Sequence, residues 1–295
     1  MHEFRPPPYG GSNQFLVALA GQFRRRGVRV SSSVIGSRTR GCLLHSYLVD
    51  VPRVRRMLHP SCRVVHRVDG PIGAYRGFDD GADQRIVEIN RALADATVFQ
   101  SRYSLEAHQE LGLELRDPVL IPNAADPRIF FPAAAPPPAP RIRLIATSWS
   151  DNPNKGGATL EWLDRHLDAD RYELTFIGRL AVELRHARIV PPVASEDLAG
   201  LLREHHVYLA PSLNDPCSNA LIEALSCGLP ALYARSGGHP ELVGEAGLGF
   251  DDAEEIPGVL DRLVSGLEGR RALIAVPRLE DVADRYLAAL GIAEQ

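Results

Sequence analysis

Short apolar runs alternate with amphipathic segments along most of the chain, and this alternation is typical of α/β proteins. Apolar runs bounded by turn-forming residues predict buried strands, whereas apolar residues three or four positions apart predict helices with one buried face. Strands are expected at 28–35, 63–65, 96–101, 118–121, 141–149, 172–178, 187–193, 207–210 and 231–234. Helices are expected at 12–26, 84–94, 157–167, 195–206, 219–227 and 280–292.

The first helix carries its own start and stop signals. Gly10 and Gly11 precede it, Ser12 is a candidate N-cap, and Gly27 ends it. In a doubly wound sheet such a glycine loop follows a buried strand, but only nine residues precede Gly10 and three of them are prolines. We therefore expect the sequence to start late, with the first strand of the N-terminal domain missing.

A proline-rich segment, AAAPPPAP, divides the chain. Consecutive prolines favour the extended polyproline II conformation, so this segment predicts a stiff connector between two domains. The length of 295 residues fits two ordinary domains. We place an N-terminal Rossmann-like domain at 1–131, the linker at 132–140, a C-terminal domain at 141–275 and a terminal helix at 276–295.

The composition is that of a soluble globular protein, with 45% hydrophobic and 24% charged residues. The chain has no run of 18 apolar residues, and its start lacks the apolar core of a secretory signal. The four cysteines show no CxxC pairing and no histidine partners at metal-binding spacing. We therefore expect reduced structural thiols in a cytoplasmic protein, without a metal site.

Charge divides the chain unequally although the total is only −4. Residues 1–140 hold 18 arginines and 13 acidic residues, a net charge of +5, and the remainder carries −9. A basic first half suits an anionic acceptor or a peripheral contact with the inner face of a membrane, while a solvated arginine-rich face is the plainer alternative. No nucleic-acid-binding motif accompanies these arginines, so nucleic acid is not an expected partner.

The richest candidate site lies at 211–250, which reads as loop, helix, strand and glycine loop. The free amides of a helix start bind phosphate, and carboxylates accept hydrogen bonds from sugar hydroxyls. This stretch offers both, so it predicts a site for a polyhydroxylated anion, although an ordinary capped helix explains any one acid alone. The candidate residues are Asp215, Ser218, Asn219, Ala220, Glu223, Gly237 and Gly238.

Two further places carry candidate chemistry. His66, Arg67 and Asp69 stand at the carboxyl end of a predicted strand, where open α/β sheets place ligand sites. Lys155 is the only lysine of the protein, against 32 arginines, and it stands at the mouth of a predicted helix. A compact ammonium there suits a phosphate site, and chance survival of one lysine is the alternative.

These motifs resemble family-four retaining glycosyltransferases of the GT-B fold. That family carries two acids separated by seven residues, then a Cys-Gly-Leu-Pro turn and a GG-x-PE loop. Asp215 and Glu223 match the two acids, with Asp215 one methylene shorter than the usual Glu. The later motifs match Cys227, Gly228, Leu229, Pro230, Gly237, Gly238, His239, Pro240 and Glu241, and a junction motif matches Asn123, Asp126 and Phe130.

The resemblance implies a role for each matched residue. Lys155 and Gly156 would bind the donor diphosphate together with Gly10, Gly11 and the helix start at 218–220. Glu223 would hold the ribose, Asp215 and Glu241 would orient the sugar, and His66 would lie beside the reacting centre with Asp69. The family's usual arginine before the lysine is absent at 147–150, so Arg179 is a candidate replacement. The terminal helix would pack back on the first domain.

The implied fold is GT-B, with two Rossmann-like doubly wound domains facing across a cleft. The implied reaction moves a sugar from a nucleotide-diphosphate sugar to a glycan, lipid-linked or small-molecule acceptor, with retention at the anomeric carbon and without a metal, in glycan or polysaccharide biosynthesis. Another GT-B enzyme, such as a nucleotide-sugar epimerase or a phosphorylase, is one alternative. A catalytically silent protein that binds nucleotide or sugar is another, since fold alone does not decide chemistry.

Overall fold

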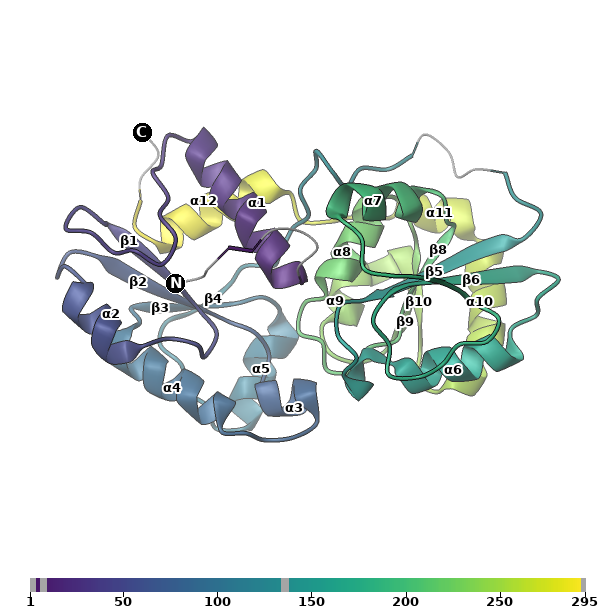
Figure 1. The fold of residues 1–295 in the computed structure, drawn as a ribbon, viewed down its shortest axis with the longest axis horizontal. Helices are drawn as coiled ribbons and strands as arrows, with labels where there is room; N and C mark the ends of the chain where they lie inside the picture. The colour runs from purple at the N-terminus through teal and green to yellow at the C-terminus, as the bar shows by residue number, and fades with distance from the viewer. Residues whose placement is uncertain (1–3, 6–9, 134–137, 293–295) are drawn as a thin grey trace.

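A computed structural model describes residues 4–5, 10–133 and 138–292. Within these residues the chain forms two parallel β-sheets, each in its own α/β domain (Figure 1). The first sheet has the strand order β1-β2-β3-β4, and the second has the order β10-β9-β8-β5-β6-β7. The prolines of the expected linker fall partly at 134–137, outside the described residues.

The first domain places helices on both faces of its sheet (Figure 1). Helix α1 covers one face, while α2 and α4 contribute to clusters on the other. Its strands are β1 (Gly41–His45), β2 (Arg63–Val68), β3 (Ala96–Phe99) and β4 (Pro118–Leu120). Its helices are α1 (Gly11–Arg25), α2 (Val51–Met57), α3 (Ile72–Arg76), α4 (Ala82–Leu93) and α5 (Arg102–Glu110).

The second domain is sandwiched in the same way. Its strands are β5 (Ile142–Ser148), β6 (Tyr172–Gly178), β7 (Arg188–Val190), β8 (Val207–Ala210), β9 (Ala231–Ala234) and β10 (Gly247–Phe250). Its main helices are α6 (Gly157–His166), α7 (Ser195–Arg203), α8 (Asn219–Ser226), α9 (His239–Val243), α10 (Ile256–Ser265) and α11 (Leu267–Ala272). Most of these elements were expected from the apolar pattern.

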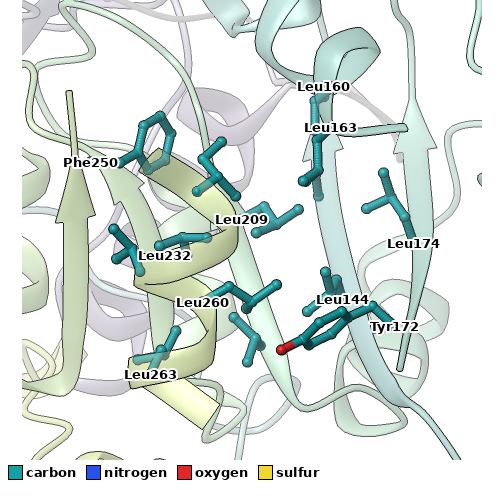
Figure 2. Packing of buried hydrophobic residues seen from close by; sticks show 14 of the residues in the cluster. Leu144, Leu160, Leu163, Tyr172, Leu174, Leu209, Leu232, Phe250, Leu260 and Leu263 are labelled. Carbon is teal, nitrogen blue, oxygen red and sulfur yellow. The ribbon is translucent and has the colours of Figure 1, made fainter. Parts of the chain in front are cut away.

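Alternate residues of each central strand point to opposite faces, and each face has its own core. Leu144 packs with Leu160 and Leu260 beneath α6 and α10, as Figure 2 shows. Its neighbour Ile145 packs on the opposite face with Leu221 beneath α7 and α8. Because both faces are covered, β8 and β9 are buried along their whole length, which explains their unbroken apolar runs in the sequence.

The last helix, α12 (Leu279–Ala289), packs on the first domain although it follows the second in the chain (Figure 1). Leu279, Tyr286 and Leu287 are buried against α1 and the first sheet. Across this contact, Nε of Arg26 lies 2.6 Å from a carboxylate oxygen of Asp284. The packing of this helix joins the two domains a second time, beside the linker.

The strand expected at 28–35 does not form, and that prediction was wrong. Val28 and Val30 pack in the core beneath α1, whereas Ile35 packs in the core on the opposite face of the sheet. The segment therefore passes around the sheet edge, and Ser33 adopts a left-handed φ of 58° within it. Apolar residues that serve two different cores produced a pattern resembling a strand.

The start of α1 also differs from expectation. Gly10 is the N-cap residue, Ser12 lies inside the first turn, and no side chain caps the helix. The side chain of Asn13 instead pairs with the backbone of Arg5, through two hydrogen bonds of 3.0 Å. The prediction that a strand before Gly10 is missing concerns residues 1–9, and most of these lie outside the described part of the chain.

No helix in the described part of the chain has both the length and the apolar character needed to cross a bilayer. All four cysteines are buried and unpaired with one another, as expected for structural thiols. Burial raises the pKa of each thiol above its ordinary value. Low thiol reactivity follows from the burial.

Candidate active site

The candidate residues gather where the carboxyl ends of the two sheets face each other. Several side chains cross this boundary at short range. The amide of Asn123 in the first domain donates to Oδ1 of Asn219 in the second at 3.1 Å. A Cβ at Gly11 would lie 2.7 Å from Cβ of Asn219, and one at Gly70 would lie 3.0 Å from Pro216. The site is therefore built from both domains.

An ion pair between Lys155 and Asp215 forms the centre of the site. Nζ of Lys155 lies 2.9 Å from Oδ2 of Asp215, and the two side chains are 19% and 8% exposed. Burial opposes ionisation of Asp215, but Lys155 and His239 outweigh it and hold the pKa of Asp215 below its ordinary value. Burial likewise opposes protonation of Lys155, and Asp215 outweighs it, so the pKa of Lys155 is raised. Both groups are charged at neutral pH.

Glycines allow the backbone segments around this pair to approach closely. Gly156 has φ of 80°, and a Cβ there would lie 2.4 Å from the carbonyl oxygen of Pro211. Gly237 has φ of 64°, and a Cβ there would lie 2.3 Å from the carbonyl oxygen of Asp215. The amide of Gly238 donates to that same oxygen at 2.9 Å. The two glycine motifs hold the loop that carries Asp215.

Two helix starts meet beside the pair. Helix α8 begins at Asn219, and Oγ of the N-cap Ser218 accepts from the amide of Leu221 at 3.3 Å. Helix α1 begins at Gly11, which lies against Asn219. The positive ends of both helix dipoles and their unpaired amides, including that of Ala220, favour an anion between them.

Glu223 lies one turn further along α8. It is partly buried and lines a small cavity of about 50 Å³ between α1 and α8, beside Phe15 and Asp126. Burial raises the pKa of Glu223 to about 8. A carboxylate in such an apolar place is costly to ionise, so it gains from hydroxyl groups that donate hydrogen bonds to it.

An aromatic ring with an arginine against it lies just after β5, next to the stretch 147–150 in which the resemblance had led us to look for an arginine. Trp149 follows β5, and the guanidinium carbon of Arg179 lies 4.6 Å from the centre of the Trp149 ring. A Cβ at Gly10 would lie 3.1 Å from the same indole. Arg179 therefore stands at the carboxyl ends of β5 and β6, and both Arg179 and the Gly10 loop lie against Trp149.

Asp69 lies at the first-domain side of the boundary. Its Oδ1 accepts from Nε2 of Gln100 at 2.6 Å and lies 3.4 Å from Arg67. Burial raises the pKa of Asp69, but His45 and Arg67 outweigh this effect, and the pKa is below its ordinary value. Arg67 itself is fully buried and donates to Oδ1 of Asn123 at 2.9 Å.

His66 does not reach the boundary. Its side chain is fully buried within the first domain, and Nε2 lies 2.8 Å from the carbonyl oxygen of Ser46. Nδ1 lies 3.4 Å from the amide of Asn90, and burial lowers the pKa of His66 to about 4. Alternate residues of a strand point to opposite faces, so His66 packs into the core while Arg67 points elsewhere. A role beside the reacting centre does not agree with this placement.

Glu241 is also engaged differently from expectation. Its two carboxylate oxygens accept from the backbone amides of Arg102 and Tyr103, at 3.0 and 2.9 Å. These amides belong to the first turn of α5, so Glu241 caps a helix of the opposite domain. The carboxylate that was expected to orient a sugar thus holds the two domains together in this structure.

Asn123 is more than the turn residue that the sequence indicated. Its side chain forms hydrogen bonds with Arg67 and Gln100 of the first domain and with Asn219 of the second. Asn123 therefore links the first domain to the start of α8. Tyr75, whose ring lies over Lys155, is a further residue of the site, and no local pattern in the sequence marks it. The asparagines near Lys155 and Asp215 are a signal that is visible in the sequence.

Larger cavities lie away from these residues. One of about 540 Å³ lies at the amino ends of β5, β6 and β7, lined by Arg143, Glu173 and Arg188 among others. Ligand sites of parallel sheets lie at the opposite, carboxyl ends of the strands. The boundary around Lys155 and Asp215 therefore remains the candidate site.

A family model matches part of the second domain. Residues 160–265, which include Asp215 and Glu223, match the family model described as glycosyl transferases group 1. MMP alpha-(1->4)-mannosyltransferase of Mycolicibacterium hassiacum is 29% identical over 195 residues, which are 57% of this chain and 47% of that protein. D-inositol 3-phosphate glycosyltransferase of Streptomyces avermitilis is 33% identical over 118 residues, 39% of this chain and 25% of that protein. The matches thus span about half and a quarter of these relatives.

Solved structures resemble the whole chain. HepE of Anabaena in complex with UDP and glucose covers 98% of this chain, and the chain covers 95% of it, with a TM-score of 0.69 and 14% identity. Sucrose-phosphate synthase from Thermosynechococcus elongatus covers 97% of this chain, which covers 76% of it, with a TM-score of 0.64 and 17% identity. The chain has the GT-B fold, which confirms the expected fold class.

Proposed function

We propose that the protein is a glycosyltransferase that moves a hexose from a nucleotide-diphosphate sugar to an acceptor hydroxyl, with retention at the anomeric carbon. The observation that carries this proposal is the buried pair of Lys155 and Asp215 beside the starts of α1 and α8. A diphosphate needs positive charge and free amides, and a sugar needs a carboxylate that stays ionised. This boundary offers all of them together.

The donor would lie across the boundary. Its diphosphate would contact Lys155 and the free amides at Asn219 and Ala220, with the backbone of Gly10 and Gly11 on the other side. When the bond between the anomeric carbon and the diphosphate breaks, negative charge grows on the departing phosphate, and these fixed donors stabilise it. Arg179, stacked on Trp149, supplies a second cation at the same edge.

The two acids would divide the remaining work. Asp215, kept ionised by Lys155, would accept hydrogen bonds from hydroxyls of the donor sugar, and Glu223 would accept them from the ribose. Asp69 would face the acceptor side. The proposal is supported by the group 1 match and by the neighbour HepE, which was solved with UDP-glucose and with UDP and glucose. A hexose donor agrees with the name of the mannosyltransferase relative.

Ligand-dependent thermal stability tests the donor site. A ligand that binds only the folded state raises the melting temperature, so the protein is screened against UDP, GDP, ADP and TDP and their common sugars. We expect a rise with one base, lost in Glu223→Ala and in Lys155→Ala and kept in Glu245→Ala, a control at an exposed acid. No rise with any nucleotide in a folded protein would refute the proposed donor site.

Turnover then separates an enzyme from a silent binding protein. The nucleotide sugar identified by the thermal screen is incubated with candidate acceptors, and release of the nucleoside diphosphate is followed. NMR coupling at the anomeric carbon of the product reports retention or inversion. Binding without release of diphosphate, even with a broad set of hydroxyl acceptors, would favour a catalytically silent protein.

A further inference from the structure

The short helix α3 is fixed to both domains at the edge of the site. At its start, the amides of Ile72 and Gly73 donate to the two carboxylate oxygens of Asp83, at 2.6 and 2.9 Å. Asp83 belongs to α4 of the same domain. The last carbonyls of a helix have no partners within it, so the carbonyls of α3 need donors from elsewhere.

Three asparagines of the second domain supply these donors. The side-chain amide of Asn154 donates to two successive carbonyls of the segment 74–76, at 3.3 and 3.0 Å. The side-chain amide of Asn214 donates to the carbonyl oxygen of Ala74 at 3.2 Å. The side-chain amide of Asn152 lies 3.5 Å from the carbonyl oxygen of Arg76. We call Asn152, Asn154 and Asn214 the asparagine clasp. The clasp holds the end of α3 against the domain that carries Lys155.

This attachment places the ring of Tyr75 over the central ion pair. Nζ of Lys155 lies 4.7 Å from the centre of the Tyr75 ring, within the range of a cation–π contact. Asp215 pairs with the same ammonium, and both Asp215 and the hydroxyl of Tyr75 raise the pKa of Lys155. The ammonium therefore lies between a carboxylate of its own domain and an aromatic ring of the other.

We infer that Tyr75 is a positioning residue of the donor site, contributed by the opposite domain and held in place by the asparagine clasp. Its ring keeps the ammonium of Lys155 beside Asp215 and keeps water away from the pair. The donor site is then complete only when α3 is docked, so docking of α3 couples closure of the two domains to donor binding. This inference rests on the proposed function.

The composition of the chain offers a direct test, because Lys155 is the only lysine. An amine-selective succinimidyl ester can label only Lys155 and the amino terminus, and mass spectrometry of the peptides separates the two. The rate of labelling at Lys155, relative to the amino terminus, measures how well the ammonium is covered. We expect Tyr75→Leu to raise this relative rate at least tenfold. Tyr75→Phe keeps the ring but lacks the hydroxyl that interacts with Lys155, so we expect it to raise the rate by a clearly smaller factor.

The clasp and a matched position complete the series. Asn154→Ala removes two of the bonds to α3 and is expected to raise the labelling rate several-fold, although it leaves Tyr75 intact. Phe78→Ala removes an exposed ring from the segment just after α3 and is expected to change nothing. Melting curves of each variant show that it is folded. Equal labelling of the wild type and Tyr75→Leu, both folded, would overturn the inference.

The donor nucleotide identified by the thermal screen separates this inference from the proposed function. We expect the nucleotide to slow labelling of Lys155 in the wild type and to bind Tyr75→Leu at least fivefold more weakly, whereas Tyr75→Phe, which keeps the ring, loses less affinity than Tyr75→Leu. Equal affinity for the wild type and Tyr75→Leu would overturn the inference and leave the function standing. No binding to the wild type would overturn both.

Discussion

Replacement of Glu223 by Gln tests whether the carboxylate in the groove between α1 and α8 is destabilised by burial. The two side chains have nearly the same shape, but only Glu can ionise. Burial raises the pKa of Glu223 from 4.5 to about 8 in the folded protein. Between pH 4.5 and about 8, Glu223 therefore keeps its proton in the folded state and loses it in the unfolded chain. The free energy of unfolding of the wild type falls as pH rises through this range.

The size of the effect follows from the shift. A change of one in pKa corresponds to about 1.36 kcal/mol. The rise from 4.5 to about 8 therefore sets an upper bound of roughly 5 kcal/mol on the cost of ionising Glu223 in the folded state. Glu223 is only partly buried, and water reaching its carboxylate reduces this value, so we expect about 2 to 3 kcal/mol. Glu223→Gln should be about as stable as the wild type near pH 4.5 and more stable by that amount at pH 8 and above.

Urea unfolding of both proteins between pH 5 and pH 9 measures the difference, because the titration of all other groups cancels between them. Glu245→Gln, at an exposed position, is the control and should show no trend. A difference between the wild type and Glu223→Gln that stays constant over the whole range would refute the reasoning. The same ionisation should make nucleotide binding tighter as pH rises toward 8 in the wild type, and this trend should be absent in the Gln variant.

Three further changes test the site and the packing around it. Lys155→Met leaves Asp215 buried without its partner, so we expect a loss of about 3 to 5 kcal/mol in unfolding free energy, largely recovered when Asp215→Asn is added; no recovery would contradict a buried ion pair. Gly237→Ala forces a Cβ to within 2.3 Å of a carbonyl oxygen at a positive φ, and we expect a loss of more than 1 kcal/mol together with weaker nucleotide binding. Leu287→Ala should cost about 2 to 5 kcal/mol and lower the melting temperature, because α12 closes the core of the first domain; a change below 1 kcal/mol would argue against that packing.

Much of the site could be predicted because its signals are local. Glycine permits close backbone approaches, which the structure shows at Gly156, Gly237 and Gly238. Serine is a common N-cap residue, and Ser218 caps α8. Lys155 is recognisable as the single lysine among 32 arginines. These features depend on neighbours within a few residues along the chain. The structure brings them together at one boundary, beyond the carboxyl ends of the strands.

Glu241 and His66 lie in different surroundings from those expected, and the partners of both residues are distant in the sequence. Glu241 meets amides 138 and 139 positions earlier, and His66 meets the carbonyl of Ser46. Nothing in the local pattern of either residue specifies those partners. The segment 28–35 likewise resembles a strand, yet its apolar residues serve two separate cores.

The sequence by itself determined many of the helices and strands, the alternation typical of an α/β protein and the types of residue available for an anionic, hydroxyl-rich ligand. Periodicity and turn chemistry decide these features, and both act over short stretches of chain. Only the tertiary structure decided that His66 lies in a core, that Glu241 caps α5 and that Tyr75 covers Lys155. Contacts between domains depend on how two packed surfaces meet, and no short stretch of sequence encodes that meeting.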